Sequence, residues 1–293
     1  MTPPAPAAPL WHIFHPSDFS PVSAVAFAHA LKLALAAHGR LTMFHVASDS
    51  ADAHWSEFPG VRATLTDWGL LAPGSAPEAV PELGIDVEKV IGIDTSPLRS
   101  IRGFLGTHPT DLIVLGTHQH HGLDRWLKHQ VAEPLARESG ALTLFVPPHT
   151  PGFVSLASGA VSLKHVLVPL DLDPAAQPAV NAAAALAAAL GAEDVRFALL
   201  HVGAANGGPH VHVRERPGWH WEQTTRSGDP VAEILAAAAA SRADLIAMTT
   251  HGHADFLDAV RGSTTERVLR DAPCPVLAIP AGTRRLEAML EKL

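Results

Sequence analysis

The chain contains two copies of one unit, and this internal repeat constrains its fold more than any other feature of the sequence. Near the end of each copy, a single offset of 133 residues aligns DLIVLGTH with DLIAMTTH and LFVP with LAIP. Near the start of each copy, HPSD aligns with VPLD and FHV with LHV, at offsets of 153 and 156. Repetition of this kind predicts two domains that share one fold.

The first copy is longer than the second. Because the offset falls from 156 to 133 along the chain, the first copy holds about 23 extra residues, and these fall within residues 54–84. Apolar residues recur through this insertion at helical spacing, namely Trp55, Phe58, Val61, Leu65, Trp68 and Leu71. The spacing predicts a helix with one apolar face. The helix is expected to be a structural lid on the rest of the protein, and the alternative is an element that binds a partner.

Each copy alternates short apolar runs with helical patterns, which predicts an α/β fold. The predicted strands are 11–15, 41–47, 111–116 and 141–147 in the first copy and 165–171, 196–203, 244–249 and 275–280 in the second. Helices are predicted over 21–38 and 175–192. The strands are apolar throughout, as in a parallel sheet that is buried on both faces. Ligands of such sheets bind at the carboxyl ends of the strands.

The repeat also sets the predicted domain boundaries. Residues 1–148 form the first domain, residues 149–164 form a linker rich in Pro, Gly and Ser, and residues 165–293 form the second domain. The apolar runs LTLFVP and PVLAIP are candidate edge strands. We expect the two domains to pack together through them as an internal pseudo-dimer, with a homodimer as a further option.

Composition excludes several classes of protein. The 293 residues carry a formal charge of −8 without a basic cluster, which argues against a nucleic-acid partner. The single cysteine, Cys274, rules out an intrachain disulfide, and no apolar run is long enough to span a membrane. The start of the chain also lacks the pattern of a signal peptide. These features predict a cytoplasmic protein without a membrane partner.

The second copy contains a candidate phosphate seat after its DLIAMT strand. Gly252 follows this strand, nine residues intervene, and Gly262 and Ser263 then begin a predicted helix, with Glu266 three residues after Ser263. Ser followed by Glu at this spacing is a capping box, and free N–H groups at a helix start attract anions. The same pattern also begins many helices that bind nothing. Asp171 and Val202, at the ends of two further strands, strengthen the interpretation as a nucleotide site.

These motifs together resemble the universal stress protein family. They are the apolar-Pro-x-Asp of the first strand, the Leu-His-Val of the second, the Gly-rich loop that ends in Gly-Ser, and the closing Ala-Pro-Cys-Pro-Val-Leu. The resemblance covers nearly the whole chain as a tandem of two domains. It implies two Rossmann-like α/β domains, each with a mostly parallel five-stranded sheet flanked by helices. It also implies that ATP or AMP, with Mg²⁺ as a companion ion, binds to the Gly-rich loop.

The resemblance assigns roles to residues of the second copy. Asp171 would contact ribose or adenine, and Val202 would contact adenine. Gly252 would contact the phosphates, and the helix start would contact the far phosphates. Histidines beside Gly252 are further candidates for phosphate contacts. The complete predicted site is Pro169, Leu170, Asp171, Val202, Thr249, His251, Gly252, His253, Gly262, Ser263 and Thr264.

Both copies depart from the family motif. In the second copy Thr249 replaces the first Gly, and its side chain intrudes where the backbone would lie against a ligand. In the first copy Gly116 is present, but Gln119 replaces the second Gly and His129-Gln130 replace Gly-Ser. We therefore expect the first domain to be a degenerate partner that does not bind ATP, although Asp18 and Val46 persist.

Other chemistries find little support in the sequence. The 19 histidines include close groups that suggest zinc, but no Cys pair or HExxH motif accompanies them, so zinc is not predicted. These groups are His118, His120 and His121; His210 and His212; and His251 and His253. The motifs of P-loop enzymes and of serine hydrolases are missing, and no catalytic residue is assigned.

The sequence thus predicts a stress-response protein that binds an adenine nucleotide in its second domain and acts as a sensor or an interaction module with little or no catalysis. Two alternatives stay open. One is a scaffold without nucleotide, whose insertion binds an unknown protein partner. The other is a slow ATPase.

Overall fold

The structure is a computed structural model that describes residues 11–51, 54–117, 140–204, 207–250 and 264–282. In the first half of the chain the strands are β1 (His12–Pro16), β2 (Arg40–Ala47), β3 (Asp86–Ile93), β4 (Leu112–Gly116) and β5 (Leu142–Val146). The helices of this half are α1 (Pro21–Ala37), the short 3-10 helix η1 (Trp55–Glu57), α2 (Val61–Asp67), α3 (Ala79–Glu82) and α4 (Pro97–Thr107).

The second half follows the same order of elements. Its strands are β6 (His165–Leu170), β7 (Val195–Val202), β8 (Trp219–Arg226), β9 (Leu245–Thr250) and β10 (Val276–Pro280). Its helices are α6 (Gln177–Ala189), α7 (Pro230–Ser241) and α8 (Thr264–Asp271).

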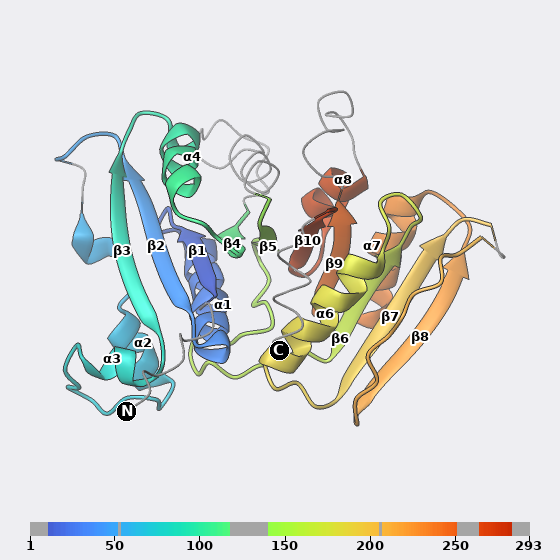
Figure 1. Ribbon diagram of the computed structural model, residues 1–293, viewed down its shortest axis with the longest axis horizontal. Coiled ribbons are helices and arrows are strands. Elements are labelled where there is room, and N and C mark those ends of the chain that lie inside the picture. Colours follow the sequence, from blue (N-terminus) through green and yellow to red (C-terminus); the bar gives the residue numbers. More distant parts are fainter. Residues whose placement is uncertain (1–10, 52–53, 118–139, 205–206, 251–263, 283–293) are drawn as a thin grey trace, which may run out of the picture.

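All of these strands belong to one sheet (Figure 1). Their order is β3-β2-β1-β4-β5-β10-β9-β6-β7-β8. Neighbouring strands are parallel except β5 and β10, which are antiparallel. The sheet therefore consists of two five-stranded parallel halves joined by one antiparallel pair, and this confirms the predicted fold class.

The eight apolar strands predicted from the sequence are all present, and β3 and β8 were missed. These two strands lie at the outer edges of the sheet, and most of their residues are at least partly exposed. An edge strand of this kind carries polar residues, such as those of DVEKVIGI, in place of a continuous apolar run. An edge strand of this kind is therefore difficult to predict from the pattern of hydrophobic residues.

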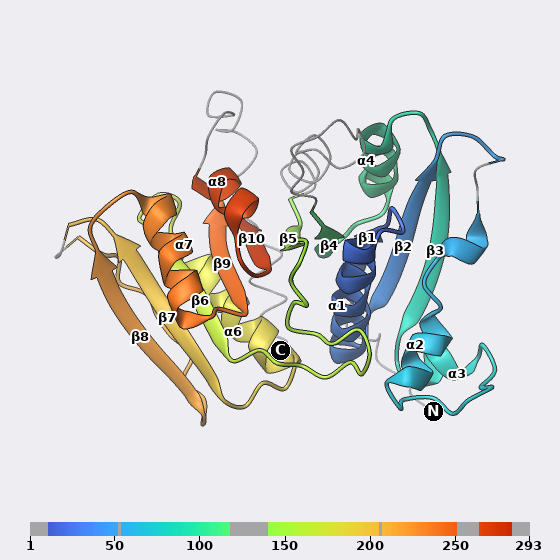
Figure 2. The same cartoon turned by 180° about the vertical axis from the view of Figure 1, so that it is seen from behind.

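The helices form a layer on each face of the sheet (Figures 1 and 2). The core on one face combines residues of α1 and α6, and these two helices also contact each other. On the other face, α4 packs on the first half and α7 and α8 pack on the second. Because the core between α1, α6 and the sheet is continuous across both halves, the halves share one apolar interior.

The join between the halves uses the two strands that the sequence singled out. Val276 pairs with Phe145, Leu277 with Leu144 and Ala278 with Thr143. Leu144 and Leu277 are buried in the core that α1 and α6 cover. The predicted internal pseudo-dimer through these strands is thus confirmed, and a homodimer stays a prediction.

Hydrogen bonds repeat between the halves as the alignment predicts. Asp111 and Asp244 are equivalent in the repeat. Asp111 immediately precedes β4, and Asp244 immediately precedes β9. The Asp111 Oδ2 accepts a hydrogen bond from the His12 N–H at 2.9 Å. The Asp244 Oδ2 accepts hydrogen bonds from the N–H groups of Lys164 and His165, both at 2.8 Å. Each carboxylate thereby holds the start of the neighbouring strand.

The insertion does not form the single helix that its apolar spacing predicts. It is divided into η1, α2 and α3, and the break between η1 and α2 falls at Phe58, whose ψ of 139° is extended. Pro59 explains the break, because a residue before proline is sterically excluded from the helical region. Trp55, before the break, is 57 % exposed, whereas Phe58 and Leu65 are buried as expected.

Residues 149–164, predicted as a linker, form an ordered connection between β5 and β6. Val154 and Val161 form an antiparallel bridge, and Phe153 and Val154 are fully buried in the core under α1. The His29 Nε2 of α1 accepts hydrogen bonds from the N–H groups of Phe153 at 3.0 Å and Val154 at 3.2 Å. This segment is therefore part of the packed interior.

The insertion packs on the same segment. The Trp68 Nε1–H donates a hydrogen bond to the Leu156 carbonyl at 3.0 Å. The Trp68 ring also covers Gly159, which has a φ of 64°, so closely that a Cβ there would lie 2.4 Å from the ring. Glycine is required at this position for both reasons. The insertion thus contacts the connection between the halves.

None of the helices in the described ranges is long and apolar enough to cross a membrane.

Candidate functional site

The carboxyl ends of three strands lie side by side in the second half, because β6 stands between β9 and β7. The three strands run in the same direction. Thr249 lies near the end of β9, Asp171 follows the last residue of β6, and Val202 ends β7. The sheet therefore brings these three predicted site residues to one edge.

Asp171 is exposed at this edge. Its Oδ1 accepts a hydrogen bond from the Leu172 N–H at 2.7 Å, and no other described residue bonds to the carboxylate. The preceding Pro169 is half-buried and Leu170 is buried, so they belong to the strand and its core. Leu172 is 68 % exposed, which is unusual for a leucine next to a sheet. Asp171 thus presents a carboxylate oxygen and an apolar neighbour at the strand end.

Val202 lies where the hydrogen-bond ladder between β6 and β7 ends. Even-numbered residues of β7 direct their backbone groups toward β6, as the bond from the Arg196 N–H to the Lys164 carbonyl shows. The last pair of the ladder is Leu170 with His201. The next N–H of the β6 chain that would serve this ladder belongs to Leu172, and it bonds to Asp171 instead. The Val202 carbonyl therefore lies beyond the last hydrogen bond between β6 and β7.

Thr249 is half-buried, and its hydroxyl oxygen is shielded from water. Within the described part of the chain this oxygen has no hydrogen-bond partner. A buried polar atom without a partner costs about 1–3 kcal/mol and calls for an explanation.

The phosphate seat falls mostly outside the described residues, which leave out His251, Gly252, His253, Gly262 and Ser263. Thr264 is the first residue of α8 and is exposed, with Glu266 in the first helical turn. Figure 1 shows α8 at the end of the sheet to which β9 points.

The second strand of each half carries a histidine next to the carboxyl ends of the strands, His201 in β7 and His45 in β2. In the sequence, each histidine is part of a family motif and has no predicted role. The Nδ1–H of His201 donates to the Leu170 carbonyl at 3.2 Å, and that of His45 donates to the Ser17 carbonyl at 2.8 Å. The same bond thus joins the first two strands of each half. The histidine shared by FHV and LHV is the sequence feature that indicates this common hydrogen bond.

The equivalent edge of the first half is covered by aromatic rings. Phe19, which has a φ of 61°, stacks on His45 with ring centroids 4.1 Å apart. The Phe58 ring meets Phe19 edge-on at 5.2 Å, and the Trp55 ring lies 6.1 Å beyond it. In the second half Gly203 and Gly208 lie so close to His201 that a Cβ at Gly203 would be 2.7 Å from its ring and one at Gly208 3.4 Å from its side chain. The two histidines are therefore packed in different ways.

The turn that places Phe19 is held by polar groups of the first half. The Asp18 Oδ1 accepts hydrogen bonds from the Ser20 N–H at 3.1 Å and the Ser20 hydroxyl at 2.7 Å. The Phe19 N–H donates to the Ser17 Oγ at 3.2 Å. Asp18 thus supports the start of α1, whereas its counterpart Asp171 bonds to the next residue.

Beneath this turn lies a buried chain of hydrogen bonds. The Ser17 and Ser23 hydroxyls are 2.9 Å apart, and the Ser23 Oγ lies 3.4 Å from the His15 Nε2. The His15 Nδ1–H donates to the Val114 carbonyl at 2.8 Å. Burial lowers the pKa of His15 to about 4, so the ring is neutral near pH 7.

A model of the universal stress protein family matches residues 12–147 and 211–280, which together make up most of the chain. The chain belongs to the universal stress protein family. A comparison with curated proteins gives no match.

Solved structures share the fold of this universal stress protein across both halves. A universal stress protein from Archaeoglobus fulgidus DSM 4304 has a TM-score of 0.59 and 18 % identity, over 92 % of this chain and 98 % of that one. A universal stress protein from Pseudomonas aeruginosa UCBPP-PA14 has a TM-score of 0.57 and 14 % identity, over 96 % of each chain. The cytoplasmic domain of a prokaryotic cation chloride cotransporter has a TM-score of 0.50 and 12 % identity, over 97 % of this chain and 100 % of that one. Likeness at these identities shows the fold alone.

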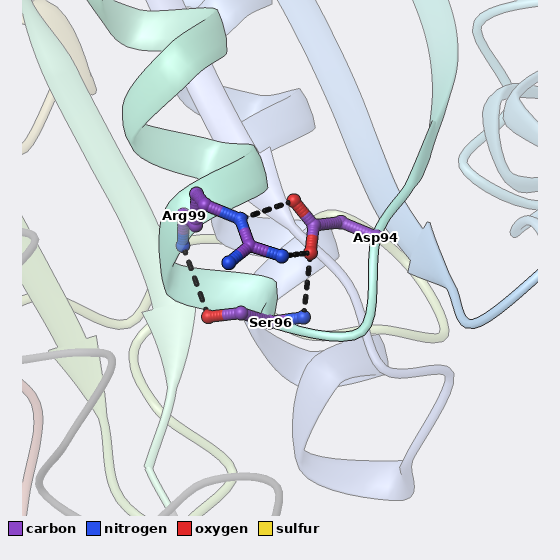
Figure 3. Close-up of polar contacts among 3 residues, drawn as sticks. All are labelled: Asp94, Ser96 and Arg99. Atoms are coloured by element: carbon purple, nitrogen blue, oxygen red, sulfur yellow. Dashed lines mark hydrogen bonds and ion pairs between the residues drawn. The ribbon is translucent and has the colours of Figure 1, made fainter.

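Two other helix starts of this universal stress protein are capped by their own side chains. At the start of α4, Asp94 accepts hydrogen bonds from the Ser96 N–H at 2.8 Å and from the Arg99 guanidinium, and the Ser96 Oγ accepts one from the Arg99 N–H (Figure 3). The hydrogen bond from Arg99 lowers the pKa of Asp94. At the start of α7, Asp229 accepts a hydrogen bond from the Ala232 N–H at 3.0 Å. Both starts are occupied by internal contacts.

The described residues of this universal stress protein hold no group of three or more metal-ligating side chains. Cys274 is buried, and burial raises the pKa of its thiol to about 12. The thiol is therefore protonated near pH 7 and is a poor nucleophile.

Proposed function

We propose that the second half of this universal stress protein binds an adenine nucleotide, ATP or AMP, and acts as a sensor or interaction module with little or no catalysis. The observation that carries the proposal is the contrast between the two strand-end edges. In the second half, Asp171, Val202 and Thr249 meet at one edge, and glycines lie against the His201 side chain. In the first half, aromatic rings stack over the equivalent edge.

The polar atoms at the second edge suit a nucleoside. The Asp171 carboxylate has an oxygen to accept hydrogen bonds from ribose hydroxyls, as acidic residues do in other nucleotide folds. The Val202 carbonyl, past the end of its ladder, would accept a hydrogen bond from the amino group of adenine. Leu172 adds an exposed apolar surface beside them for the base.

The phosphate contacts belong to the Gly-rich loop and the start of α8. We assign them to Gly252, His251, His253, Gly262, Ser263 and Thr264, with Mg²⁺ as a companion of ATP. Free N–H groups and hydroxyls at a helix start favour a phosphate group.

We further propose that any hydrolysis is slow. The Cys274 thiol is buried with a pKa of about 12, and among the described residues His15 and His29 are buried and committed to backbone hydrogen bonds. These residues do not face the proposed site as a general base. The role of the bound nucleotide is then to change the surface or the stability of the second half.

Isothermal titration of the full chain with ATP and Mg²⁺ tests the proposal. We expect saturable binding of one nucleotide per chain. Replacing Gly262 with His introduces the residue of the first half, and replacing Ser263 with Ala removes the capping hydroxyl, so we expect this double variant to lose binding. As a matched control, Asp18→Asn alters the first half and should leave affinity unchanged if the chain remains folded.

The result that would overturn the proposal is the absence of binding heat for ATP and AMP at high micromolar protein. That result would favour a scaffold without nucleotide. Binding with two nucleotides per chain would also contradict it, because the first half is predicted not to bind.

A further inference from the structure

The hydroxyl of Thr249 has no hydrogen-bond partner among the residues that the structure describes, and its neighbours explain why. Thr249 pairs with Ile279 of β10. On its other side, the register that sets Val166 opposite Leu245 brings Leu170 level with Thr249. Both Ile279 and Leu170 are buried apolar residues of the core under α6. The hydroxyl therefore lies between two apolar side chains that cannot bond to it.

The first half treats the equivalent position differently. Gly116 aligns with Thr249, and a Cβ at Gly116 would lie 3.1 Å from the Val22 side chain at the start of α1. Helix α1 begins three residues after Asp18, whereas α6 begins six residues after Asp171. The first half thus begins its helix closer to this strand end than the second half does.

Burial of this hydroxyl costs the ligand-free protein stability. A valine has nearly the same shape and carries no polar atom, so it would fill the space between Ile279 and Leu170 at lower cost. The next residue, Thr250, provides the contrast, because its hydroxyl lies 3.4 Å from the Ile279 carbonyl as a donor. Within the described ranges, the Thr250 hydroxyl has a hydrogen-bond partner and the Thr249 hydroxyl has none.

We infer that the Thr249 hydroxyl forms a hydrogen bond with an oxygen of the bound nucleotide, and that Thr249 is a specificity-determining residue of the second half. The inference rests on the proposed nucleotide site. Thr249 lies at the strand end beside Asp171, and as a residue it is only half-buried. Because the hydroxyl is already shielded from water, a ligand oxygen gains a hydrogen bond without displacing water from it. The departure from the family's glycine then adds a contact.

The test compares Thr249→Val with Thr249→Ser in two measurements. For Thr249→Val we expect the thermal midpoint of the ligand-free protein to rise by about 2 °C and the affinity for ATP to fall about tenfold. Thr249→Ser keeps the hydroxyl and should bind ATP within about twofold of the wild type. Repeating the titrations with adenosine separates the ribose from the phosphates, because loss of adenosine binding would place the partner oxygen on the ribose.

Thr250→Val is the matched control. It makes the same chemical change one residue later, on the opposite face of the strand, and removes a hydroxyl that has a partner. We expect its thermal midpoint to fall and its ATP affinity to stay unchanged.

The outcomes separate the two proposals. Absence of ATP binding by the wild type would overturn the proposed function and the role of Thr249 with it. Wild-type binding that Thr249→Val retains in full would overturn the role of Thr249 alone. A lower thermal midpoint for Thr249→Val would also overturn it, because the hydroxyl would then have a partner in the ligand-free protein.

Discussion

His29 can hold the connection between the halves only as a neutral ring. Its Nδ1–H donates to the Val25 carbonyl at 2.8 Å, so its Nε2 must be the acceptor for the N–H groups of Phe153 and Val154. Burial lowers the pKa of His29 to about 4, whereas the unfolded chain titrates near 6.5. The stability that His29 contributes is therefore complete above pH 6.5 and is lost as the pH falls toward 4.

Replacing His29 with Gln keeps an acceptor and removes the titration. We expect the free energy of unfolding to depend less on pH in His29→Gln than in the wild type between pH 6.5 and 4, by up to about 1.4 kcal/mol per pH unit. His29→Phe removes the acceptor and should cost roughly 2–4 kcal/mol at pH 7. Denaturant unfolding measured at several pH values checks both.

Exposed His220 gives the control for this series, and His220→Gln should follow the pH dependence of the wild type. Equal slopes for His29→Gln and the wild type would show that His29 does not contribute to the pH dependence. No local pattern predicts this residue's role, because its partners lie 124 and 125 residues away along the chain.

Among the elements, the insertion shows what periodicity can predict. The spacing of Phe58, Val61 and Leu65 correctly predicted an apolar face, and these residues are buried. The same spacing overlooked Pro59, which ends η1 before α2 begins. It also gave no sign that Trp68 packs on Gly159, because that contact depends on how two distant segments meet.

Trp68 provides the prediction at this scale. We expect Trp68→Ala to expose the connection between the halves, so that residues 149–164 exchange amide hydrogens faster and are cleaved sooner by proteases. Trp68→Phe should have a smaller effect, because it loses the hydrogen bond to Leu156 and keeps most of the packing. Hydrogen exchange of residues 149–164, measured by mass spectrometry in both variants, checks this prediction.

Trp55 in the same insertion serves as the matched control, because its ring is mostly exposed. Trp55→Ala should leave the protection of 149–164 unchanged. If Trp68→Ala also left it unchanged, the insertion would not be what holds this segment.

For the whole molecule, the shared core predicts how the protein unfolds. Residues of α1 and α6 belong to one apolar cluster that spans the antiparallel pair of β5 and β10. We therefore expect one cooperative thermal transition, with equal calorimetric and van't Hoff enthalpies. Two resolved transitions in a calorimetric scan would contradict this, since they would show that each half unfolds alone.

A charge at the join tests the same prediction directly. Ala278 is 6 % exposed and pairs with Thr143 across the join. Ala278→Lys would bury an unpaired ammonium and should lower the whole transition by several degrees. Thr224→Lys, on the exposed edge strand β8, is the control and should change it little.

At this scale the sequence predicts much of the fold and a smaller part of the site. The repeat and the apolar runs predicted two domains and the pairing of β5 with β10, because each feature is repeated or continuous along the chain. The placement of Asp171, Val202 and Thr249 at one edge follows from parallel strands. The aromatic cover of the first half was not predicted, because it requires the turn at Phe19 to bring that ring onto His45.

The antiparallel pair lies within one polypeptide, and this has a consequence for stoichiometry. An assembly of separate subunits comes apart on dilution, whereas segments of one chain meet at a fixed local concentration. Identical subunits would also present two identical edges. This tandem instead guarantees that every molecule, however scarce, carries one edge whose histidine is stacked with aromatic rings and one whose histidine lies against glycines, in a ratio that expression level cannot alter.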